Sequence, residues 1–124
     1  MSQDALTLAE EAKARHGQGN GQNQQDPGAV SILASIAAAS DLSPTDIMGQ
    51  RKTTEIVIAR HLVVWMLRHH LGWGLRQIAR QVGKSPATIW QSSQEADHLM
   101  KYDRHLIRLY SRTLSILGYP HGVR

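Results

Sequence analysis

Apolar residues recur at intervals of three and four from about residue 29 to residue 117. This spacing places them on one face of an α-helix. Residues that favour helix starts and helix ends divide the pattern into separate segments. The predicted helices are 28–40, 44–48, 55–71, 75–82, 86–99 and 103–117. We therefore expect an all-α fold, a small helical bundle of about five or six helices.

Residues 75–93 contain the most informative pattern in the sequence, a pair of short helices joined by a tight turn. The first helix of this pair has a narrow apolar face made of Leu75, Ile78, Ala79 and Val82. Gly83 can end it in a left-handed conformation, and Ser85-Pro86 can begin the next helix as N-cap and first helical residue. Two helices joined in this way form a helix-turn-helix, whose second helix enters the DNA major groove. An ordinary αα-corner in a helical domain is the alternative interpretation.

The second helix of the pair has an inner and an outer face. Its inner face is expected to hold Ile89, Ser93 and Ala96, and its outer positions Pro86, Ala87, Trp90 and Gln91. For Trp90 itself, burial in the core is favoured over exposure beside DNA or a partner, because large aromatic side chains dominate burial energetics.

The predicted helix 55–71 is the longest in the chain and is apolar on nearly every side, which indicates a place at the centre of a bundle. Its polar exceptions, Arg60, His61 and Arg68, fall within about 100° of one another on the helical wheel. We interpret them as a wet stripe that can follow DNA phosphates, and a merely solvated face is the alternative. The basic loop before this helix, residues 49–53, contains Arg51 and Lys52.

A chain of 124 residues supports one domain with a tail. Residues 2–16 could form a short helix, and the Gly/Gln/Asn-rich segment 17–28 has almost nothing to bury. We expect a flexible, largely disordered tail over residues 1–28 and the folded domain over residues 29–120. The last few residues are expected to fray.

Charge is distributed unevenly along the chain. The formal net charge is +4, but residues 1–28 carry −2, whereas residues 29–124 hold twelve Lys and Arg against six Asp and Glu, a net of +6. A basic domain favours a polyanionic partner. There is no cysteine, no membrane-spanning run and no signal peptide, which suits a cytoplasmic, nucleoid-associated location.

Seven histidines raise the question of a metal or catalytic site. None of them forms an H-E-x-x-H motif, and the adjacent His69 and His70 point about 100° apart on a helix. No Ser/His/Asp order stands out either. We expect no metal, no cofactor and no enzymatic activity.

The order of these segments resembles the C-terminal DNA-binding domain of DnaA, the bacterial replication initiator. IAAASDLSPTDIMGQRKTT is similar to that family's first helix, short turn helix and basic loop. IARHLVVWMLRHHLGWGLRQIARQVG is similar to its central helix and the start of its helix-turn-helix, and Lys101-Tyr102-Asp103 to the break before its last helix. The similarity runs from about Ile32 to Leu117. No phosphate-binding G-x-x-x-x-G-K-[ST] loop is present, so a freestanding DnaA-like domain is expected rather than an initiator.

The resemblance implies which residues contact DNA. The basic loop, with Arg51, Lys52 and Thr53, would reach the minor groove, and Arg60, His61 and Arg68 would touch phosphates. Arg76 and Arg80, one turn apart on the first helix of the motif, are interpreted from their spacing as backbone clamps. The turn and the start of the recognition helix would supply Lys84, Ser85, Pro86, Ala87 and Thr88, and Gln91 lies one turn further along.

The chain departs from the family at the recognition turn. The family signature Gly-Gly-Arg-Asp-His-Thr-Thr is replaced by Gly83-Lys84-Ser85-Pro86-Ala87-Thr88, which is one residue shorter. The side chains of Pro86 and Ala87 cannot hydrogen-bond a base edge, although Ala can meet a thymine methyl group. This predicts that the family's usual origin box is not strongly preferred.

Two functions are therefore weighed. The first is a sequence-preferring double-stranded DNA-binding protein that regulates transcription or replication. The second is a protein-interaction module, for example a phage or mobile-element antagonist of a host replication or regulatory protein. Ser85, Pro86 and Ala87 offer few side-chain groups that could hydrogen-bond a base, which favours the protein-interaction module. The retained cations favour the DNA-binding protein. The sequence leaves the oligomeric state open.

Overall fold

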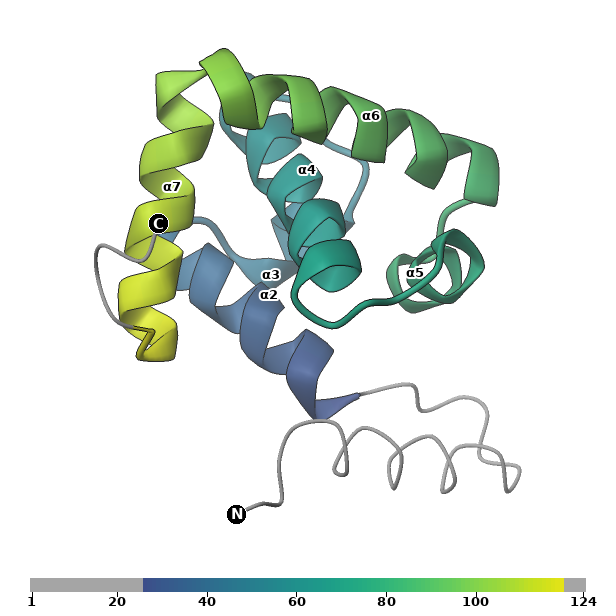
Figure 1. The fold of residues 1–124 in the computed structure, drawn as a ribbon, viewed down its shortest axis with the longest axis horizontal. Coiled ribbons are helices and arrows are strands. Elements are labelled where there is room, and N and C mark those ends of the chain that lie inside the picture. The colour runs from purple at the N-terminus through teal and green to yellow at the C-terminus, as the bar shows by residue number, and fades with distance from the viewer. Residues whose placement is uncertain (1–25, 120–124) are drawn as a thin grey trace.

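The computed structural model describes residues 26–119, which contain helices and no strand (Figure 1). The helices are α2 (Pro27–Ser40), α3 (Pro44–Met48), α4 (Thr54–His69), α5 (Leu75–Val82), α6 (Pro86–Tyr102) and α7 (Arg104–Leu117). The predicted all-α bundle is confirmed. The expected helix over 2–16, most of the expected linker and the expected fraying at the C-terminus concern residues outside this range.

Short polar side chains fix where the helices begin. The Asp26 carboxylate accepts hydrogen bonds from the backbone N–H groups of Gly28 and Ala29, at 2.9 and 3.2 Å. It thereby satisfies amides that the first turn of a helix leaves unpaired. Helix α2 therefore begins at Pro27, one residue before the predicted start of the first helix at residue 28. Ser43, Thr53, Ser85 and Asp103 cap the later helices α3, α4, α6 and α7 in the same way.

Helix α4 lies at the centre, with α2, α3, α6 and α7 packed around it (Figure 1). Its residues Ala59, Leu62 and Met66 are completely buried, as expected for a helix that is apolar on nearly every side. It is not the longest helix, however, because α6 has 17 residues and α4 has 16. Helix α6 continues to Tyr102 and ends at Asp103, whose backbone N–H donates to the Leu99 carbonyl and whose carboxylate caps α7.

The predicted helix-turn-helix is confirmed as α5, a short turn and α6. Gly83 ends α5 with φ of 74°, a left-handed conformation that glycine adopts without steric cost. Its N–H and that of Lys84 both donate to the Ala79 carbonyl, at 2.9 and 3.1 Å. Ile89, Ser93 and Ala96 face inward as expected.

Trp90 corrects one expectation from the sequence. Its side chain is 52% exposed, whereas Trp73, in the link between α4 and α5, is 8% exposed and belongs to the core. Ile89 and Ser93 occupy the strip of α6 that faces the core, so the position of Trp90 turns outward. The exposure of Trp90 therefore follows from its position on the helical wheel of α6 and not from the size of its side chain.

Candidate nucleic-acid interface

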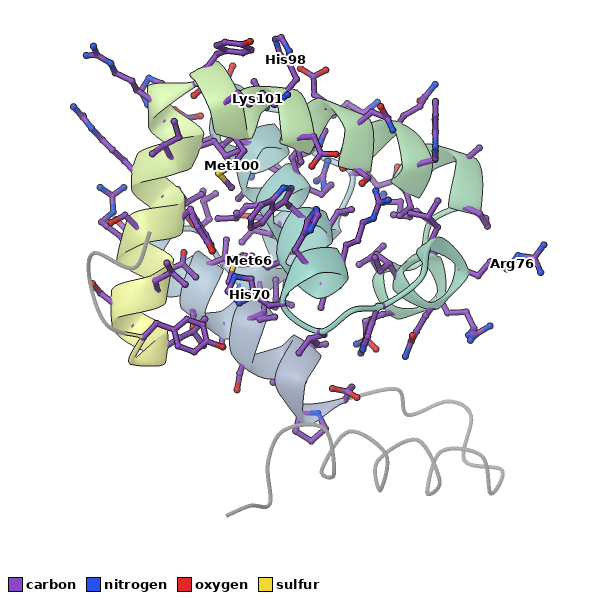
Figure 2. The ribbon with its side chains drawn as sticks, viewed as in Figure 1. Met66, His70, Arg76, His98, Met100 and Lys101 are labelled. Carbon is purple, nitrogen blue, oxygen red and sulfur yellow. The ribbon has the colours of Figure 1, made fainter. Side chains whose placement is uncertain are left out.

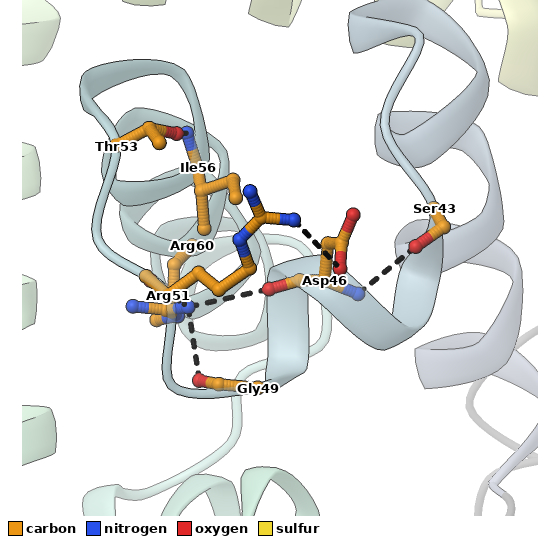
Figure 3. A network of polar contacts seen from close by, with 7 residues as sticks. All are labelled: Ser43, Asp46, Gly49, Arg51, Thr53, Ile56 and Arg60. Carbon is orange, nitrogen blue, oxygen red and sulfur yellow. Dashed lines mark hydrogen bonds and ion pairs between the residues drawn. The ribbon is translucent and has the colours of Figure 1, made fainter.

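The shape of the basic loop, residues 49–53, depends on Arg60 (Figure 3). The Arg60 Nε donates to the Ile47 carbonyl at 2.6 Å, and Nη2 donates to the Gly49 and Arg51 carbonyls at 3.0 and 2.9 Å. A longer contact of 3.4 Å reaches the Asp46 carbonyl. The guanidinium therefore joins the end of α3 and the basic loop to the side of α4.

This geometry gives a structural role to the three polar residues expected on one side of α4, and their contact with phosphates stays a prediction. Arg60, His61 and Arg68 are all half-buried and bonded to other parts of the domain. Burial lowers the pKa of the Arg60 guanidinium below its ordinary value, although a guanidinium remains charged at neutral pH. The helical wheel gave the direction of these side chains correctly. It could not show that α3, the basic loop and α6 partly cover that side of the helix.

His61 and Arg68 connect α4 to the recognition helix α6. The His61 Nδ1 and the Ser92 Oγ share a hydrogen bond of 2.7 Å. Arg68 Nη1 donates a short hydrogen bond to the Ser93 Oγ. Burial lowers the pKa of His61, with a smaller lowering from Arg60, while Glu95 acts in the opposite direction. These bonds fix the position of α6 against the central helix.

The outward side of the basic loop carries its other cations. The Arg51 side chain is 69% exposed and makes a long ion pair of 3.9 Å with Asp46. Exposed ion pairs of this kind contribute little to stability, so Arg51 can exchange its partner at little cost. Lys52 is exposed as well, whereas the Thr53 Oγ1 accepts from the Ile56 N–H at 3.4 Å and caps α4.

The basic loop and the recognition helix border one groove, which we call the interface groove. It has a volume of about 600 Å³. One wall is formed by the basic loop and α4, and the other by the turn and the first half of α6. Its lining residues are Gln50, Lys52, Val57, Arg60, His61, Lys84, Thr88, Gln91, Ser92 and Glu95.

The remaining candidates do not line this groove. Ser85 caps α6, since its Oγ accepts from the Thr88 N–H at 3.1 Å and donates to the Thr88 Oγ1 at 3.0 Å. Pro86 and Ala87 are exposed at the tip of α6. Arg76 and Arg80 are exposed on α5, where Arg76 points away from the domain (Figure 2). Four lining residues of the groove were not anticipated, Gln50, Val57, Ser92 and Glu95. Glu95 lies one turn beyond Gln91, so the same helical spacing could have identified it.

Residues 26–119 contain neither a candidate metal site nor a candidate membrane-spanning helix. No group of three or more His, Asp and Glu side chains there could hold a metal ion. No helix of the same range is long and apolar enough to span a bilayer.

Comparisons with known proteins agree with the helix-turn-helix. The chain matches a family model described as the helix-turn-helix of bacterial DnaA protein, over residues 30–95. It is 29% identical over 66 residues to the chromosomal replication initiator protein DnaA of Kosmotoga olearia. That region is 53% of this chain but 15% of the relative. No solved structure matches this chain.

The family match begins in α2 and ends within α6, so it includes the basic loop, the central helix and the recognition turn. The expected similarity between residue 96 and Leu117 is not covered and stays a prediction. Because the matched residues are more than half of the sequence, the chain belongs to the family of bacterial DnaA helix-turn-helix domains.

Proposed function

We propose that this chain is a sequence-preferring double-stranded DNA-binding protein that regulates transcription or replication at the nucleoid. The start of α6 enters the major groove, and the basic loop lies at the adjacent minor groove. Neither role requires catalysis, and no enzymatic activity is part of the proposal.

One observation carries this proposal, the interface groove. Lys52 on one wall and Lys84 on the other lie where a duplex could meet both, although they come from segments 32 residues apart. The bonds of Arg60 and His61 hold the two walls in a fixed relation. A fixed pair of cationic walls positions a duplex, because phosphate contacts set the register of a protein on DNA.

The division of labour within the proposed interface follows from side-chain chemistry. Lys52, Lys84, Arg76 and Arg80 supply phosphate or minor-groove contacts. Gln91 is exposed one turn from the tip of α6, and an amide side chain can hold adenine through two hydrogen bonds. Ala87 can contribute a contact to a thymine methyl group. Arg60, His61 and Arg68 act chiefly by holding the loop and α6 in place.

A salt titration of duplex binding tests the proposal. About four to seven neutralised phosphates give a slope of roughly −4 to −6 for log K against log salt. Selection from a random duplex pool should then yield a preferred sequence. Affinity that stays flat from low to physiological salt contradicts the proposal and favours the protein-interaction module instead.

A further inference from the structure

Helix α7 carries a set of cations that the interface groove does not use. Its sequence, RHLIRLYSRTLSIL, contains three arginines and one histidine and no acidic residue. Arg104, Arg108 and Arg112 are spaced four residues apart and are all exposed, and we call them the arginine stripe. Successive members are about 6 Å apart along the axis and rotate by about 40°, so they follow one side of the helix.

No carboxylate within residues 26–119 forms an ion pair with the arginine stripe, although Glu55 lines the same pocket as Arg112. Arg104 and Arg108 make no hydrogen bond and no ion pair to any residue within 26–119. Arg112 uses its Nε for a 3.3 Å bond to the Ala39 carbonyl. The nearest carboxylate in sequence, Asp103, is engaged as the cap of α7 and accepts from the Leu106 N–H at 3.1 Å. The stripe therefore presents net positive charge to solvent.

We propose that the arginine stripe binds the phosphates of a second DNA segment, so that one molecule can bridge two duplexes. This rests on the proposed function for the first contact, at the interface groove. Helix α7 packs on α2, α4 and α6, and it lies across α4 from α5 (Figure 1). The interface groove is lined by the basic loop, α4, the turn and α6 and by no residue of α7, so the arginine stripe lies outside the first contact.

The chemistry of the stripe fits duplex phosphates. A duplex carries one negative charge per about 1.7 Å of its axis, so several phosphates fall within the roughly 12 Å between Arg104 and Arg112. Guanidinium groups bind phosphate oxygens through two parallel hydrogen bonds. The exposed hydroxyl of Ser111, on the same side of the helix, adds a further polar group.

Two other partners fit the surface less well. A membrane-surface helix needs an exposed apolar face, whereas Leu106, Leu109 and Thr113 of α7 are buried in the domain. Ile107 and Ile116, 40% and 50% exposed, flank the stripe, and the exposed Tyr102 and Tyr119 lie before and after α7. A protein partner normally requires a central apolar or aromatic anchor, and the middle of the stripe has none.

A capture assay tests the proposal with the full chain. One duplex is immobilised, the protein is added, and the retention of a second, labelled duplex is measured. We expect the unaltered protein to retain it. The double variant Arg104→Ala/Arg108→Ala should retain about tenfold less while its binding to a single duplex stays within about twofold, because it loses only the second set of phosphate contacts. Arg104→Lys/Arg108→Lys, which preserves charge, should restore most of the retention.

The other outcomes separate the two proposals. If the protein binds one duplex but never retains a second, or if the alanine variant retains it equally well, the bridging proposal is overturned and the interface groove stands. If no duplex is bound at all, both proposals fail. Light scattering decides whether bridging comes from a dimer: a loss of dimer mass in the alanine variant would identify the stripe as a protein contact and overturn the proposal.

Discussion

At the scale of single residues, Arg60 shows how a cation can hold a loop in place. Its guanidinium bonds four backbone carbonyls at the end of α3 and in the basic loop. These contacts are available only to a planar fork with several N–H groups. The position of Lys52, two residues before the start of α4, follows from the loop that Arg60 holds.

Arg60→Lys separates this role from a direct phosphate contact, because lysine keeps the charge but cannot bond the carbonyls together. We expect it to lower the free energy of unfolding by about 1–2 kcal/mol, measured in urea, since carbonyls lose their partners. Duplex affinity should fall too, and Lys52→Ala should then cost less than it does in the unaltered protein. Arg76→Lys, on the exposed side of α5, is the matched control. Unchanged stability with reduced affinity would instead assign Arg60 to the phosphates.

Lys52 and Gln91 are expected to contribute to binding in different ways. Lys52→Ala should weaken binding to every duplex and reduce the magnitude of the salt slope by about one. Gln91→Ala should lose about 1–3 kcal/mol on the preferred sequence and almost nothing on a scrambled one. Both variants are titrated on both duplexes, with Gln94→Ala as control, since Gln94 is exposed on α6 but does not line the interface groove. An equal loss for Gln91→Ala on both duplexes would make Gln91 a backbone contact.

The residue scale is also where sequence reasoning is weakest. Helical spacing correctly placed Arg60, His61 and Arg68 on one side of α4, but it could not show that α3 and α6 cover that side. In the first helix, the apolar spacing of Val30 relative to Leu33 and Ala37 would place it inward, whereas Val30 is 41% exposed and Ala29 and Ile32 are buried. A shift of one position in the apolar stripe is within the tolerance of a helical wheel.

At the scale of elements, the ends of helices were predictable because they depend on local chemistry. Ser43-Pro44 and Ser85-Pro86 begin α3 and α6, and Gly83 and Gly118 end α5 and α7 in left-handed conformations. The contacts between elements were not predictable in this way. The hydrogen bond between His61 and Ser92 joins residues 31 positions apart, and no spacing rule relates them.

The junction of α4 and α7 should make stability depend on pH. The His70 Nε2 and the Tyr110 hydroxyl share a hydrogen bond of 2.8 Å, and the Tyr119 ring stacks on His70 at 5.5 Å between centroids. Burial, and to a lesser degree His69, lowers the pKa of His70 below 6.5. Burial raises the pKa of Tyr110, so its hydroxyl stays protonated.

Because the folded state disfavours the protonated imidazole, the unfolded chain binds more protons than the folded one just below pH 6.5. Stability from His70 is therefore full above about pH 6.5 and is lost as pH falls through the lowered pKa. We expect His70→Asn to weaken this acid-side decline in urea unfolding measured at several pH values. His61 has a pKa lowered in the same direction, so His61→Asn is measured alongside, and the double variant should show the weakest decline. An unaltered decline in the double variant would place its origin in other groups.

At the scale of the whole molecule, the sequence predicted the architecture because independent signals indicated the same helical DNA-binding domain. These signals were the apolar spacing, the helix caps, the basic charge and the family resemblance. The all-α fold and the helix-turn-helix are confirmed, and the family match covers the same central segments. The interface groove itself was only partly predictable. Its cations, Thr88 and Gln91 were named, but the presence of Ser92 and Glu95 in it depends on how α6 lies against α4.

The shape of the recognition turn leads to a prediction for the molecule as a whole. The turn is one residue shorter than the family signature. Ser85 and Thr88 are hydrogen-bonded to each other through the Ser85 hydroxyl. Pro86 and Ala87 occupy the exposed tip without any hydrogen-bonding side chain. In the proposed interface, base reading would therefore depend on Gln91 and methyl contacts, while the proposed phosphate contacts would remain.

The family's origin box should accordingly be bound no more than moderately better than a scrambled duplex at physiological salt. Specific proteins commonly prefer their sites by a factor of a thousand or more, and each lost bidentate base contact removes about 1–3 kcal/mol of that discrimination. Equilibrium titration of both duplexes in the same buffer measures the ratio. A preference of about a thousandfold or more for the box would mean that the shortened turn still presents an equivalent surface. A small ratio combined with a slope of roughly −4 to −6 against log salt would locate the affinity in the phosphate contacts and leave sequence preference to Gln91.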